Sequence, residues 1–126
     1  MLKKMNVNPK NLKAGDCVVR AIAYATEQSW EDVYDKLCEL GKKMKRMPNE
    51  KQVYEKYLEQ LGWFKFKQPR RFDNTKYTVD EFCKEFPKAR YVVSVANHLT
   101  AVDERLIIDT WDCGRKSVGN YFKKFA

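Results

Sequence analysis

The chain has 126 residues and a formal net charge of +8, with 44% hydrophobic and 33% charged residues. This size and composition predict one globular domain over residues 1–126 and argue against a disordered or membrane protein. No apolar run approaches the ~18 residues that a membrane-spanning helix needs, and no apolar stretch follows the basic N-terminus to form a signal peptide. We therefore expect a cytoplasmic protein with no membrane partner.

A buried helix is predicted over residues 17–26, directly after a polar segment with turn signals. Asp16 is a favourable N-cap residue, which makes Cys17 the first helical residue. The residues that follow are apolar nearly all round the helix, and such a helix is normally buried.

Three further helices are indicated before the sequence changes character at residue 90. Apolar residues at helical spacing predict one helix at 29–41, ended by Gly41, and another at 49–62, ended by Gly62. A capping-box pattern opens a short helix at 78–86.

The last third of the chain is rich in β-branched residues. The expected strands are residues 63–67, 89–96, 98–102, 105–109 and 117–125, with a loop at 68–77. Helices therefore come first and an antiparallel sheet follows, which predicts the α+β class with a C-terminal antiparallel sheet.

The single histidine lies in one of these strands, near an aspartate of the next. A two-residue turn at Asp103 and Glu104 would place His98 directly across from Asp109, with their Cβ atoms about 5 Å apart. A three-residue loop would instead place Thr110 across from His98. In the first register, a carboxylate can hydrogen-bond the imidazole.

Cys17 is the best candidate for a reactive thiol among the four cysteines. The start of a helix favours a thiolate through its free N–H groups and its dipole. Cys38 and Cys83 adjoin large apolar residues and are expected to be buried, whereas Cys113 is expected to be exposed. No Cys-x-x-Cys pair is present, and with one histidine a zinc site has weak support.

Two segments, GDCVVRAIAYAT and NHLTAVDERLIIDTWD, resemble the papain-like cysteine peptidase superfamily. The similarity is to the small form seen in bacteriocin-processing peptidase domains and in short peptidase-like proteins of bacteria and their phages. GDCVVRAIAYAT resembles the nucleophile helix, and NHLTAVDERLIIDTWD resembles the histidine strand followed by the strand of the third catalytic residue. The resemblance implies a papain-like fold with Cys17 as nucleophile, His98 as general base and then acid, and Asp109 as orienting group.

The resemblance also implies further site residues. The family places a Gln or Asn about six residues before the cysteine to bind the oxyanion; Asn11 matches that position here, and Asn8 is the alternative. Trp111 would shield the His–Asp pair from water. Asp112 is a rival to Asp109 for the orienting role.

The activity implied is cleavage of a peptide or isopeptide bond through an acyl-enzyme, without a metal or cofactor, in a bacterial or phage-infected cell. The same residues would serve transglutaminase-like transfer or deamidation, because an amine or water can resolve a thioester. The substrate would be a peptide or protein.

The excess of Lys and Arg (25) over Asp and Glu (17) supports an alternative function. A catalytically vestigial protein on the same fold would bind nucleic acid or a host or phage protein, with Arg70 and Arg71 on the phosphates and Trp63 or Phe64 stacked on bases. The basic residues are scattered among acidic ones, so we expect nucleic-acid binding to be weak and salt-sensitive.

Overall fold

A six-stranded sheet with helices on both faces forms the fold in the computed structural model, which describes residues 1–124. The helices are α1 (Cys17–Thr26), α2 (Trp30–Met44), α3 (Lys51–Gln60) and α4 (Val79–Glu85). The strands are β1 (Leu2–Lys4), β2 (Trp63–Phe66), β3 (Arg90–Val95), β4 (His98–Asp103), β5 (Leu106–Asp109) and β6 (Tyr121–Lys124). The chain is therefore α+β, as predicted. Phe125, the last residue of the expected final strand, lies outside the described residues.

The number of helices agrees with the prediction, but some of them begin or end at other residues than predicted. α1 begins at Cys17 as predicted, and α4 begins with the predicted capping box. The prediction that Gly41 ends α2 is wrong: the helix continues to Met44, and Lys45 takes the left-handed conformation that closes it. Gly41 is instead a point of close contact, because a Cβ there would lie 2.7 Å from the backbone oxygen of Arg46.

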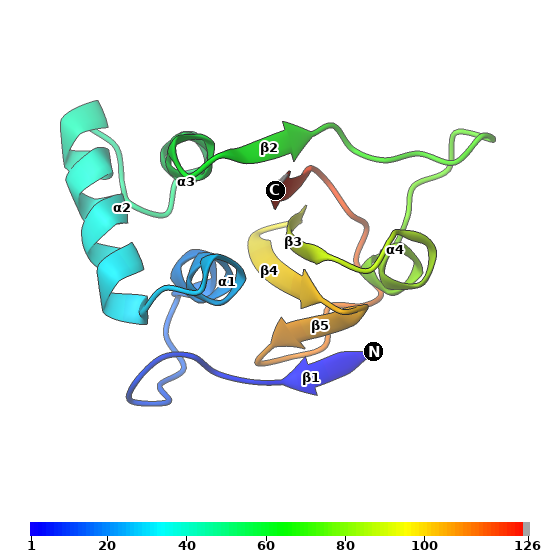
Figure 1. The fold of residues 1–126 in the computed structure, drawn as a ribbon, viewed down its shortest axis with the longest axis horizontal. Coiled ribbons are helices and arrows are strands. Elements are labelled where there is room, and N and C mark those ends of the chain that lie inside the picture. The colour runs from blue at the N-terminus through cyan, green and yellow to red at the C-terminus, as the bar shows by residue number, and fades with distance from the viewer. Residues whose placement is uncertain (125–126) are drawn as a thin grey trace.

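The predicted antiparallel sheet is in fact mixed. Its strand order is β1-β5-β4-β3-β6-β2, and β1 runs parallel to β5. Sequence reasoning missed β1 because three residues show no alternation, and the strand is held by pairing with β5 from the far end of the chain. Figure 1 shows that this pairing brings the N-terminus to the edge of the sheet beside β5.

The register between β4 and β5 differs from the prediction by two residues. The turn consists of Glu104 and Arg105, both with positive φ, and Asp103 pairs with Leu106 inside the ladder. Asp103 stays in its strand, where its carboxylate accepts a hydrogen bond from Tyr24 Oη at 2.7 Å.

This register places Asp109 diagonally from His98, not directly across from it. The pair Ala101↔Ile108 puts Asp109 next to Thr100, which lies two residues after His98 on the same strand. Side chains alternate between the two faces of a sheet, so a shift of two residues keeps them on one face. The predicted contact is therefore retained although the predicted pairing is wrong.

Each face of the sheet has its own apolar core, which fixes where α1 sits. One core joins α1, α2 and α3 to β4, and its sheet residues include Val92, Leu99, Ala101 and Ile108. The other joins α4 to the opposite face through Val93, Val102 and Ile107. Packing of α1 against β4 brings Cys17 at the start of the helix into contact with His98 at the start of the strand. Within residues 1–124, no helix combines the length and apolar character needed to cross a membrane.

Candidate active site

Cys17 is the first residue of α1 and is half-buried above the start of β4. Burial by itself raises the pKa of this thiol. Hydrogen bonds with the His98 side chain and the Leu99 backbone, together with the positive charges of His98 and Arg20, outweigh burial and lower the pKa below its ordinary value. The structure therefore brings the predicted nucleophile and base together and favours the thiolate.

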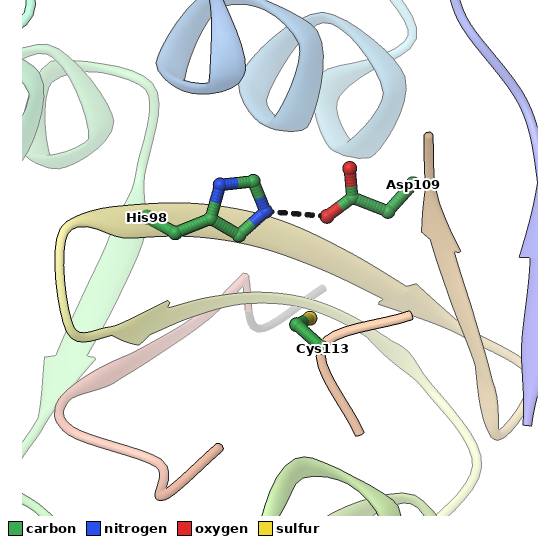
Figure 2. Close-up of side chains that lie close together, drawn as sticks. All are labelled: His98, Asp109 and Cys113. Carbon is green, nitrogen blue, oxygen red and sulfur yellow. Dashed lines mark hydrogen bonds and ion pairs between the residues drawn. The ribbon is translucent and has the colours of Figure 1, made fainter. Parts of the chain in front are cut away.

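His98 connects this thiol to a carboxylate. Its Nε2 atom lies 2.6 Å from Oδ2 of Asp109, and Figure 2 shows the ring directed along this contact. Nδ1 is then the ring nitrogen left for Cys17. Burial lowers the pKa of His98, but the contacts with Asp109 and with the Cys17 thiolate raise it to about 9. At pH values between the lowered pKa of the thiol and the raised pKa of the imidazole, Cys17 is a thiolate and His98 is an imidazolium.

Asp109 is held by donors on both carboxylate oxygens. Oδ2 also accepts a hydrogen bond from Thr100 Oγ1 at 2.6 Å, and Oδ1 accepts one from the backbone N–H of Thr110 at 2.7 Å. Burial raises the pKa of this carboxyl, but the hydrogen bonds with His98 and Thr100 and the charge of His98 more than compensate and lower it. Asp109 therefore stays ionised and its orientation is fixed.

Thr100 was missed by sequence reasoning, although a signal for it existed. It lies two residues after His98 on β4, so strand periodicity places both side chains on one face. Trp111 lies over the imidazole, with ring centroids 4.8 Å apart and the planes tilted by 51°. This is the position in which shielding of the His–Asp pair was expected.

The other candidate polar residues have partners or positions other than those expected. Asp112 is exposed, and its carboxylate accepts a hydrogen bond from the N–H of Gly114 in a turn. Asn8 is buried and donates its amide N–H to Asp16, while Asn11 is exposed with a left-handed backbone. Neither asparagine lines the groove beside the nucleophile, so the oxyanion role of Asn11 stays a prediction.

The other three cysteines differ from Cys17 in their surroundings. Cys83 is buried as predicted, and burial raises its pKa to about 11. Cys38 is half-buried. The prediction that Cys113 is exposed is wrong, because the chain turns beneath the sheet after β5 and packs this thiol into the core on the α4 side. Burial there raises its pKa to about 12.

Cys113 comes close enough to His98 and Asp109 to raise the question of a metal site. One ligand atom from each residue lies within 4.8 Å of the others, the one such grouping of three among residues 1–124. Figure 2 shows Cys113 near this pair, and its thiol already has Thr100 as a hydrogen-bond partner. A thiol with a raised pKa is a poor metal ligand, and the nearer carboxylate oxygen already accepts two hydrogen bonds. These residues therefore suit a hydrogen-bonded pair better than a metal centre.

A groove of about 480 Å³ opens beside Cys17 and His98. Its remaining lining residues are Val18, Asn49, Lys51, Tyr54, Ser94, Val95, Asn97 and Leu99, none of them acidic. They come from α1, α3, the loop before α3 and the β3–β4 hairpin, so no local sequence pattern could have assembled them. The groove therefore reaches both Cys17 and His98.

Comparisons of the chain with protein-family models, curated proteins and solved structures gave no match. The function is therefore inferred from the site itself.

Proposed function

We propose that the protein is a thiol hydrolase that cleaves a peptide or isopeptide bond through an acyl-enzyme on Cys17. The observation that carries this proposal is the chain of contacts from the helix-terminal thiol to His98 and from its Nε2 atom to Asp109 at 2.6 Å. A nucleophile, a base and an orienting carboxylate are the three parts that thiol acyl transfer requires. The open groove beside them supplies room for a substrate.

In the first half-reaction, the thiolate sulfur of Cys17 attacks the carbonyl carbon of the scissile bond. Backbone N–H groups in the first turn of α1 have no helical acceptors and would stabilise the oxyanion that forms. Collapse of this intermediate breaks the C–N bond, and the imidazolium of His98 gives its proton to the departing amine. The products of this step are a thioester on Cys17 and a free amine.

In the second half-reaction, water attacks the thioester. Neutral His98 takes a proton from the water, a carboxylic acid leaves, and the thiolate–imidazolium pair is restored. An amine in place of water would give transfer, and a side-chain amide as substrate would give deamidation. Asp109 keeps the imidazole oriented and its charge stabilised throughout.

We also infer that the fold is papain-like. The supporting observation is the order of parts: a buried helix that begins at the nucleophilic cysteine packs against antiparallel strands that bear the base and the orienting residue. The resemblance of the two sequence segments points the same way.

Of the residues predicted to contact nucleic acid, Phe64 is exposed, but Trp63 and Arg71 are less available. Trp63 is only 7% exposed, so its ring is not available to stack on a base. Arg71 is already paired, with its Nη2 atom 3.0 Å from Glu81 and 2.8 Å from Glu85. Hydrolysis through Cys17 is therefore the function that the geometry supports best.

The direct test is proteolysis of a complex peptide mixture, with new N-termini identified by mass spectrometry. We expect the unmodified protein to produce new termini, the Cys17→Ala variant to produce none, and the matched Cys38→Ala variant to act like the unmodified protein. Trapping of an acyl group on the Cys17 peptide would identify the intermediate. Cleavage that survives Cys17→Ala, or a Cys17 thiol that alkylates with an ordinary pKa near 8.5, would overturn the proposal.

A further inference from the structure

Arg20 is a largely buried cation one helical turn after Cys17. Its side chain is only 11% exposed, and its guanidinium contacts two buried carboxylates. Nη1 pairs with Oδ1 of Asp16, and Nη2 lies 3.5 Å from Oδ1 of Asp109. Arginine is almost never buried without such partners, and its planar fork suits contacts with two groups at once.

Asp16 is fixed independently of Arg20. Its Oδ2 atom accepts hydrogen bonds from Asn8 Nδ2 at 3.0 Å and from Trp30 Nε1 at 2.9 Å. Although Asp16 occupies the N-cap position of α1, its side chain makes no capping hydrogen bond. The carboxylate is thus used to hold the guanidinium, anchored by the N-terminal loop on one side and by α2 on the other.

The Arg20 contact complements that of His98. His98 and Thr100 bind Oδ2 of Asp109, whereas Arg20 and the Thr110 N–H face Oδ1. Donors on both oxygens leave the carboxylate no freedom to rotate. Rotation would break the 2.6 Å bond that orients the imidazole.

We propose that Arg20 is a positioning residue, anchored by Asp16, that fixes the Asp109 carboxylate and so holds His98 in place to maintain the Cys17 thiolate. The inference deepens the proposed function and rests on it. Arg20 touches neither the scissile bond nor the attacking sulfur in this role; it acts through Asp109.

The charges around the site are a second reason to assign a positioning role to Arg20. The ionisable groups at the site lie on several elements: Asp16, Cys17 and Arg20 at the start of α1, Tyr54 of α3, His98 of β4, Asp109 of β5 and Cys113 after β5, with Lys51 at the edge of the groove. Without Arg20, two buried carboxylates and a thiolate would face a single imidazolium. Clustered negative charges in a partly buried site disfavour further ionisation, and the thiolate is the easiest of them to protonate.

The test uses Arg20→Met and Arg20→Lys in the full chain, with Lys36→Met as a control that removes the same charge from an exposed site on α2. The rate of alkylation of Cys17 by iodoacetamide is measured against pH, with peptide mapping to separate the four thiols. Loss of the guanidinium and of its hold on Asp109 should raise the folded pKa of the thiol, so we expect the alkylation profile of Arg20→Met to move to higher pH by about one unit, which makes alkylation about tenfold slower at pH values below the folded pKa. Lys36→Met should match the unmodified protein.

Arg20→Lys separates positioning from folding. A lysine keeps a charge beside Asp16 but cannot hold both carboxylates with one planar fork. We expect its melting temperature to return toward that of the unmodified protein while the alkylation profile stays shifted. If Arg20→Lys has an unshifted profile, the guanidinium is needed only for charge and the positioning role is wrong.

A double-mutant cycle with Asp109→Asn tests whether Arg20 acts through Asp109. We expect Arg20→Met to change the alkylation profile of the Asp109→Asn protein by less than about threefold. A full effect of about tenfold in that background would overturn the proposal. If Arg20→Met alone does not fold, Asp16→Asn with Arg20→Met removes both charges together and replaces it in the cycle.

These measurements are independent of the substrate. If no peptide is cleaved but the Arg20 shift is found, the proposed hydrolysis fails and the positioning of the thiolate stands. If peptides are cleaved but the Arg20 variants alkylate normally, the proposed function stands and the positioning role fails.

Discussion

Replacing Cys17 by alanine should make the stability of the protein depend on pH in a range where the unmodified protein shows little dependence. The reason lies in the coupled ionisation of Cys17 and His98. The imidazole has its pKa raised to about 9 by Asp109 and the thiolate, and the thiol has its pKa lowered mainly by its hydrogen bond with His98, against the effect of burial.

The two groups have opposite effects on stability as the pH rises. A raised histidine pKa stabilises the fold fully below the unfolded value of 6.5, and this stabilisation is lost as the pH rises through about 9. A lowered thiol pKa stabilises the fold fully above the ordinary value of 9.0, and this stabilisation is lost as the pH falls through the folded pKa. From pH 6.5 to about 9, wherever the pH is also above the folded pKa of the thiol, the folded pair and the unfolded groups each hold one proton, so the free energy of unfolding stays level.

Cys17→Ala removes the second effect and leaves the first. The free energy of unfolding should then fall by about 1.4 kcal/mol per pH unit above pH 6.5 until His98 loses its proton. The rise from 6.5 to about 9 corresponds to about 3 kcal/mol. The His98 side chain is only 8% exposed, so solvent screening reduces this little, but part of the rise comes from the deleted thiolate. We therefore expect a total fall of about 1–3 kcal/mol in the variant.

Urea unfolding at pH 6.5, 7.5 and 8.5, followed by tryptophan fluorescence, measures these free energies. Because the chain has one histidine, its ring resonances give the pKa of His98 directly by NMR. Cys38→Ala is the matched control and should retain the level profile. A histidine that titrates near 6.5 in the folded unmodified protein, or a Cys17→Ala variant with no pH dependence, would refute the reasoning.

Three further predictions concern other parts of the molecule. Asp109→Asn should retain part of the hydrolytic activity, because its amide oxygen can still accept a hydrogen bond from the imidazole N–H, whereas Asp109→Ala should lose much more. Equal losses of kcat/KM in the two variants would show that the negative charge is essential. Gly41→Ala should lower the melting temperature by an amount equivalent to about 1–3 kcal/mol, because its Cβ would meet the Arg46 oxygen at 2.7 Å, and a rise would contradict this contact. Nucleic acid should bind with a Kd of about 10⁻⁴–10⁻⁶ M in anisotropy titrations, and the affinity should fall as the salt concentration rises. A tight, salt-resistant complex that is lost in the double variant Arg70→Ala, Arg71→Ala would instead support the alternative function.

Local signals in the sequence predicted the four helices and the start of α1 and α4, although not the end of α2. A cap residue and apolar spacing place the start of α1 at Cys17, and the capping box places the start of α4. These features depend on neighbours within one helical turn, which a single sequence shows directly. The period-two alternation of β4 and β5 likewise indicated that His98 and Asp109 share a face, although the predicted register was off by two residues.

The tertiary structure decided what depends on contacts between distant segments. β1 is a strand only because β5 pairs with it, and the turn falls at Glu104 and Arg105 because Asp103 is held in the ladder by Tyr24 from α1. Cys113 is buried because α4 covers it.

The environment of Asp109 also depends on contacts between distant segments. Spacing in the sequence indicates that Asp16 and Arg20 can pair on one helix. Only the packing of α1 against the sheet brings that guanidinium within 3.5 Å of the carboxylate on β5. Local sequence thus indicated the candidate residues Cys17, His98 and Asp109, whereas the charges around them are brought together only by packing between segments that are distant in the chain.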